Sequence, residues 1–178
     1  MATARQAVEA IDAVWRLPRG VARWHADRLR TAGLISSTQG RPSPMPSRDI
    51  SHVLLSILTG TASDTSRIAQ YADLRPDTGG PPLVDAVAAY VDNPADFFEL
   101  RIDQFAPGAT LTYRAADRGI TTTHFAEREP RARPAFDCLA VLPAGALIEL
   151  AAALKSAPPI RVGRRRVAER WASPLDVI

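Results

Sequence analysis

The sequence has a single cysteine, Cys138, among its 178 residues, and no apolar run reaches the roughly 18 residues that a membrane-spanning helix needs. A lone thiol excludes an internal disulfide and any zinc cluster made of several cysteines. We expect Cys138 to be packed rather than reactive. Residues 1–15 lack a long apolar block followed by a small-residue cleavage site, so the sequence predicts a cytoplasmic protein without membrane association.

The common catalytic motifs are absent as well. The sequence contains no GxxxxGKS/T phosphate loop, no GxSxG turn, no HExxH pattern and no DxDxDG pattern. Its three histidines, His25, His52 and His124, fall in three different predicted elements. His124 and Cys138 would supply a base and a nucleophile, but both lie in strand-like segments where packing accounts for them better. We therefore predict a protein that is not an enzyme and needs no cofactor or metal ion.

What the sequence does have is segregated charge. The formal net charge is +3, but residues 1–48 carry eight arginines against three acids, and residues 156–178 carry five arginines against two acids. Residues 49–155 hold nine basic and 14 acidic side chains. Two basic terminal segments that flank an acidic central segment favour a protein that binds a polyanion through one surface. The alternative is that the charges are distributed by chance in a sequence rich in arginine.

The first 74 residues show helical spacing of apolar side chains in four segments. Helices are predicted over residues 3–15, over 19–32, from Ser47 as N-cap to Gly60, and over 63–74. Pro18 separates the first two helices, and Gly33 suits a left-handed residue that ends the second. Leu34 and Ile35 then look strand-like, and residues 36–47 look like an exposed loop rich in serine and proline.

A proline- and glycine-rich segment, RPDTGGPP at 75–82, is the clearest linker in the sequence. After a helix over 83–91, the apolar spacing changes to period two, which predicts an antiparallel meander. Pro143 begins a last helix, and the tail over 157–178 is basic. The prediction is an α+β fold, mainly α. Its parts are a DNA-binding domain over 1–74, a linker over 75–82, a dimerisation or partner domain over 83–156 and the tail.

The segment LRTAGLI at 29–35 resembles the end of the recognition helix and the first wing strand of winged helix-turn-helix DNA-binding regulators from bacteria and phages. In that family a loop with a basic residue follows and forms the wing, and here that loop reads QGRP at 39–42. The resemblance covers residues 5–60. It implies an N-terminal winged helix-turn-helix whose second helix enters the major groove of DNA.

The helix predicted over 19–32 has a cationic face when drawn as a wheel. Arg19, Arg23, Asp27 and Arg30 share one stripe, while Val21, Ala22, Ala26 and Leu29 form the buried side. Arg23 and His25 are our candidates for base contacts, and Arg16 and Arg19 are our candidates for phosphate contacts. We expect Trp24 to be in the core, the alternatives being stacking against a sugar or a place in a dimer contact. We expect His25 to be exposed and mostly neutral near pH 7.

Two further segments supply candidate contacts. Arg41, in the loop, would reach the adjacent minor groove or its backbone. In the tail, Arg164, Arg165 and Arg166 would neutralise phosphates without reading sequence, unless they serve only as a soluble terminus.

The leading hypothesis is a sequence-specific regulator that binds double-stranded DNA as a homodimer, with residues 83–156 also able to contact a protein partner. A second hypothesis is a subunit that recognises DNA for phage packaging, similar to a small terminase, and it predicts a ring. A third is an adaptor that binds a protein through its acidic middle and binds no DNA. The outline of a small regulator favours a phage or prophage origin.

Overall fold

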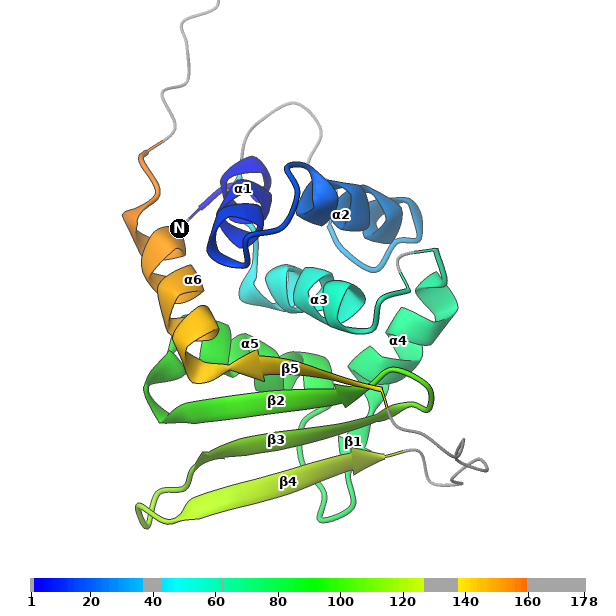
Figure 1. The fold of residues 1–178 in the computed structure, drawn as a ribbon, viewed down its shortest axis with the longest axis vertical. Coiled ribbons are helices and arrows are strands. Elements are labelled where there is room, and N and C mark those ends of the chain that lie inside the picture. The colour runs from blue at the N-terminus through cyan, green and yellow to red at the C-terminus, as the bar shows by residue number, and fades with distance from the viewer. Residues whose placement is uncertain (1, 37–42, 62, 127–137, 160–178) are drawn as a thin grey trace, which may run out of the picture.

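The computed structural model describes residues 2–36, 43–61, 63–126 and 138–159, and it has an α+β fold. Figure 1 shows a stack of helices above an antiparallel sheet. In the described part of the chain the helices are α1 (Ala4–Val14), α2 (Val21–Thr31), α3 (Ser47–Leu58), α4 (Thr65–Asp73), α5 (Leu83–Asp92), the short 3-10 helix η1 (Pro94–Asp96) and α6 (Ala144–Ser156). The predicted α+β class and the positions of the helices are confirmed.

The strands form one sheet. They are β1 (Arg75–Pro76), β2 (Phe97–Asp103), β3 (Gly108–Arg114), β4 (Ile120–Ala126) and β5 (Leu139–Pro143), in the order β1-β4-β3-β2-β5. Every neighbouring pair is antiparallel, so the predicted meander is confirmed as β2-β3-β4. Leu100, Ile102 and Leu111 are buried on one face, as period-two alternation requires.

Helix α3 is the centre of the helical stack. Nine of its 12 residues are buried, and it packs against α5 on one side and α2 on the other. In Figure 1, α1 and α2 lie farthest from the sheet, and α6 runs along the side of the stack. The layers therefore leave one side of α2 open while its other side meets α3.

The buried apolar residues form one cluster that includes Ile11 and Leu54 before the predicted linker and Leu100 and Leu150 after it. The segment 75–82 contains β1, which pairs with β4. The two halves of the chain thus share a core. Whether the two halves are separate domains depends on whether each folds independently, so the predicted division into domains stays a prediction.

Two local predictions are wrong. Leu34 and Ile35 form no strand among the described residues, because Gly33, at φ +74°, and Leu34 end α2 with a Schellman motif. The Gly33 and Leu34 amides donate to the carbonyls of Arg30 (3.1 Å) and Leu29 (2.9 Å). Ser47 is not the cap of α3, because Pro46 holds that position and the Ser47 hydroxyl donates to the carboxylate of Asp92.

Cys138 is exposed rather than packed, and its thiol donates to Oε1 of Gln104 at 3.0 Å. It directly precedes the edge strand β5. Among the described helices none has both the length and the apolar content to span a bilayer.

Candidate functional site

The turn between α1 and α2 is fixed by a buried carboxylate. Asp12, on α1, is 9% exposed, and its two oxygens accept from the backbone amides of Gly20 (2.7 Å) and Ala22 (2.8 Å). Gly20 has φ +93°, a conformation that favours glycine, and is the N-cap residue of α2. Asp12 therefore does the work of a capping side chain from the preceding helix.

Helix α2 buries the side that its spacing predicts. Ala22, Ala26 and Leu29 are each at most 2% exposed. The opposite side faces solvent and bears Arg23, Trp24, Asp27 and Arg28, all of which are exposed. We call this outward side the α2 face, and it also includes Arg16 and Arg19 from the preceding turn, both exposed.

Positive charge dominates the α2 face. Residues 15–36 contain five arginines and one acid, Asp27. Asp27 lies 2.6 Å from Nη1 of Arg30 and 3.7 Å from Nε of Arg23, so two of the arginines share it. Within the described residues the remaining three, Arg16, Arg19 and Arg28, form no ion pair. An exposed cluster with unpaired guanidinium groups is suited to an anionic partner.

Trp24 was expected in the core, but it is 50% exposed on the α2 face. The guanidinium carbon of Arg28 lies 5.9 Å from the centre of its ring, within the range of a cation–π contact. The rings of Trp24 and His25 form a T-shaped pair with centroids 5.2 Å apart. Burial follows position on α2 rather than residue type, because Trp24 projects between the arginines and His25 projects toward α3.

His25 was expected to be exposed, and this expectation is wrong because His25 is 7% exposed, so a base contact would require its side chain to leave the core. Its Nδ1 lies 2.7 Å from the hydroxyl of Ser56 on α3. Burial lowers the pKa of His25, and nearby Asp12 opposes this shift. The imidazole is neutral near pH 7, as expected, but burial rather than the neighbouring arginines is the main cause.

We expect the free energy of unfolding to fall when the pH is lowered below about 6.5. Burial is the largest cause of a lowered pKa for both His25 and His52, so the unfolded chain binds these protons more tightly than the folded chain. Their contribution is complete above the ordinary pKa of 6.5 and is lost as the pH falls toward the folded value. The loss is at most about 1.4 kcal/mol per pH unit for each histidine.

Urea denaturation at pH 7.5 and pH 5.5 measures this effect. His25→Gln should make the pH dependence shallower, because it removes one of the two buried titrating groups. Equal or greater stability of the wild-type chain at pH 5.5 would show that the buried histidines do not control it.

The remaining predicted contacts lie outside the described residues. Arg41 falls in the segment 37–42, and Arg164, Arg165 and Arg166 fall in 160–178. The described site thus consists of Arg16, Arg19, Arg23 and Arg30 from the prediction, together with Trp24 and Arg28, which sequence reasoning did not assign to it.

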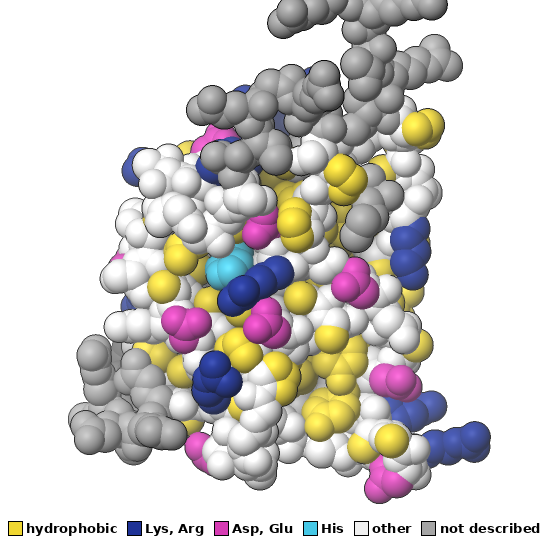
Figure 2. All heavy atoms as spheres, turned by 180° about the vertical axis from the view of Figure 1, so that it is seen from behind, with side chains coloured by type: hydrophobic (Ala, Val, Ile, Leu, Met, Phe, Trp, Pro, Cys, Tyr) yellow, Lys and Arg dark blue, Asp and Glu magenta, His cyan; other side chains and the backbone are white. Residues whose placement is uncertain are grey.

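The face of the molecule seen in Figure 2 differs from the α2 face in its distribution of charge. On the face seen in Figure 2, acidic and basic side chains are interspersed among hydrophobic ones, and neither sign forms a continuous patch among the described atoms in view. Within the described ranges no three His, Cys, Asp or Glu side chains gather closely enough to hold a metal ion. The α2 face is therefore the best candidate for contact with a macromolecule. No protein-family model, no curated protein and no solved structure matches this chain.

Proposed function

We propose that the protein binds double-stranded DNA through the α2 face and acts as a transcriptional regulator. The observation that carries the proposal is the exposed row of arginines on a helix whose opposite side is anchored in the core. Arg23 has 77% of its side chain exposed, whereas Ala22, one residue away, is fully buried. A rigid helix with its cationic side outward has the form that enters a major groove.

The dimensions suit this role. The 11 residues of α2 extend about 16 Å at 1.5 Å per residue. In the proposed complex Arg23, in the first half of α2, forms a bidentate contact with guanine, the commonest specific arginine contact. Arg16 and Arg19 lie before the helix begins and bind phosphates. Trp24, held by Arg28, lies against a sugar or a thymine methyl group.

In this proposal α1 and α2 act as a helix-turn-helix whose angle Asp12 sets, and Arg41, outside the described residues, stays a further candidate contact. A single 11-residue helix contacts few base pairs, so selective binding requires a homodimer on a two-fold symmetric site. Residues 83–156 would provide the contact between the protomers.

A mobility-shift experiment with genomic fragments at two salt concentrations tests the proposal. We expect binding that weakens steeply with salt, together with a shifted fragment that survives at the higher concentration. If no fragment shifts at low salt, the protein does not bind DNA and the adaptor hypothesis gains support. A shift without preference among fragments would contradict a sequence-specific regulator.

Asp27→Asn is expected to tighten DNA binding by roughly three- to tenfold at low salt. The change removes the one acid of the α2 face and frees Arg23 and Arg30 for phosphates. The stability cost should be below about 1 kcal/mol, because the ion pairs are exposed. Fluorescence anisotropy with a labelled duplex measures the affinity. Asp77→Asn, an equal charge change at an exposed site away from α2, is the control. Unchanged or weaker binding of Asp27→Asn would argue against contact at this face.

A further inference from the structure

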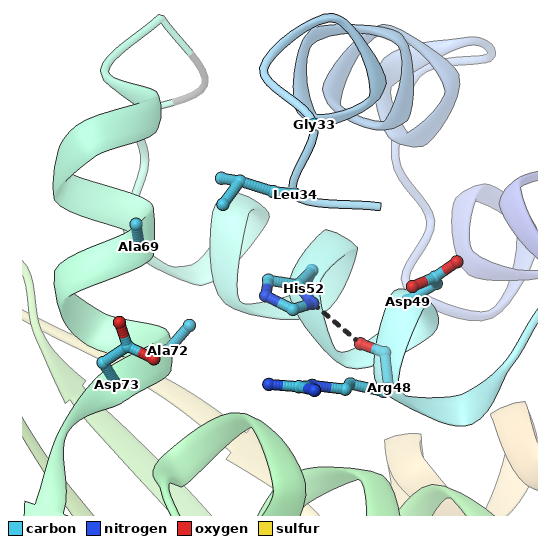
Figure 3. Close-up of a pocket in the computed structure, with 8 residues that line it drawn as sticks. All are labelled: Gly33, Leu34, Arg48, Asp49, His52, Ala69, Ala72 and Asp73. Atoms are coloured by element: carbon cyan, nitrogen blue, oxygen red, sulfur yellow. Dashed lines mark hydrogen bonds between the residues drawn. The ribbon is translucent and has the colours of Figure 1, made fainter. Parts of the chain in front are cut away.

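A cavity of about 290 Å³ lies between the segment that follows α2, helix α3 and helix α4. Figure 3 shows that side chains from all three elements surround it. Ala69 and Ala72 on α4 are small and leave the space open, while His52 and Arg48 on α3 and Asp73 on α4 supply polar groups. The volume is at the lower end for ligand sites, which suits a small molecule.

His52 presents a hydrogen-bond acceptor to this cavity. It is 7% exposed, and its Nδ1 lies 3.0 Å from the backbone carbonyl of Arg48. A carbonyl oxygen can only accept, so Nδ1 carries the proton and Nε2 of the neutral ring has a free lone pair. In Figure 3 this second nitrogen points toward α4. No group in the described part of the chain hydrogen-bonds to it.

Arg48 supplies donors beside that acceptor. Its Nε lies 3.1 Å from the Asp85 carboxylate on α5, which holds the side chain in place. Figure 3 shows the guanidinium next to the His52 ring and directed toward the side of Asp73. Its Nη nitrogens have no ion-pair partner among the described residues. Asp49 also lines the cavity, but its carboxylate already accepts hydrogen bonds from the amide and the hydroxyl of Ser36.

We propose that this cavity binds a small zwitterion with neighbouring ammonium and carboxylate groups, of the kind that free α-amino acids provide. The ligand carboxylate accepts from the Nη nitrogens of Arg48, and its ammonium donates to Nε2 of His52 and to the carboxylate of Asp73. Each polar group of the cavity then has a partner of opposite character. A ligand with only one of the two charges leaves either Arg48 or the pair His52 and Asp73 without a partner in the ligand, so it forms fewer charge-assisted hydrogen bonds and binds more weakly.

The test is a titration of the ¹⁵N-labelled full-length protein with L-alanine, L-leucine and L-glutamine, followed by amide chemical shifts. We expect at least one of them to move the signals of Gly33, Ala69 and Asp73. Propionate and ethylamine, which each keep one charge of alanine, should bind at least about tenfold more weakly. No shift with any amino acid up to roughly 10 mM would overturn the proposal, since even millimolar affinity would be detected. Equal binding of the analogues would overturn it as well.

Asp73→Asn should weaken amino-acid binding by about tenfold or more, because a neutral amide replaces the partner of the ammonium. Asp77→Asn is the matched control. It makes the same change four residues later, outside the cavity lining, and should leave binding unchanged. Equal binding of wild type and Asp73→Asn would contradict the assigned orientation. The titrations contain no DNA, so their outcome is independent of the proposed function.

Discussion

Replacing Arg19, Arg23 and Arg28 together with alanine is expected to weaken binding to duplex DNA by roughly 100-fold or more, because each charged contact contributes about 1 kcal/mol or more. All three side chains are exposed on the α2 face, and the buried side of α2 is untouched. The slope of log affinity against log salt should fall by about 1, since Arg19 is the one of the three that binds a phosphate in the proposed complex. Fluorescence anisotropy over a salt series measures both quantities.

The matched control replaces Arg75, Arg101 and Arg114 with alanine. These arginines are exposed on strands β1, β2 and β3, so the net charge falls equally at a surface remote from α2 in the fold. The control should keep both the affinity and the salt slope of the wild type. Equal losses in both triple variants would mean that net charge, and not the α2 face, governs binding.

Asp12→Ala is expected to lower the free energy of unfolding by about 3 kcal/mol. The variant loses two hydrogen bonds to a charged acceptor and leaves the amides of Gly20 and Ala22 without that partner. Ala22 is fully buried, so water replaces the carboxylate poorly at its amide. Urea denaturation monitored by circular dichroism gives the value.

Asp27→Ala provides the comparison for Asp12→Ala. Asp27 is also on this pair of helices and also charged, but its carboxylate is 55% exposed and makes surface ion pairs. Its replacement should cost less than about 1 kcal/mol. Asp12→Asn should fall between the wild type and Asp12→Ala, because the amide keeps one acceptor. A loss of less than about 1 kcal/mol for Asp12→Ala would show that the carboxylate does not fix the turn.

Local signals in the sequence were sufficient for most elements. Helical spacing, Pro18 and Gly33 placed α1 and α2, and period-two alternation placed the meander. Where two local signals competed, the prediction failed. Leu34 and Ile35 are apolar and β-forming, but the carbonyls at the end of α2 need partners, and the Schellman motif that satisfies them uses Leu34.

Trp24 is exposed and His25 is buried, the reverse of the prediction, and this shows a second limit of prediction from sequence. Residues 22, 25, 26 and 29 follow the spacing of one helix side, so His25 belongs with buried Ala22, Ala26 and Leu29, and Trp24 does not. Assigning Trp24 to the core by its residue type overrode this spacing. Asp12 as a distant cap and the cavity at His52 depend on contacts between separate helices, for which a single sequence has no local signal.

The central claim is that the α2 face contacts DNA, and amide chemical-shift mapping with a duplex fragment that shifts in gels tests it most directly. We expect the largest changes to fall within residues 16–31, with the side-chain Nε signals of Arg19, Arg23 and Arg28 among them. Signals of β2, β3 and β4 should move little. Changes concentrated on the sheet, with α2 unaffected, would contradict the account.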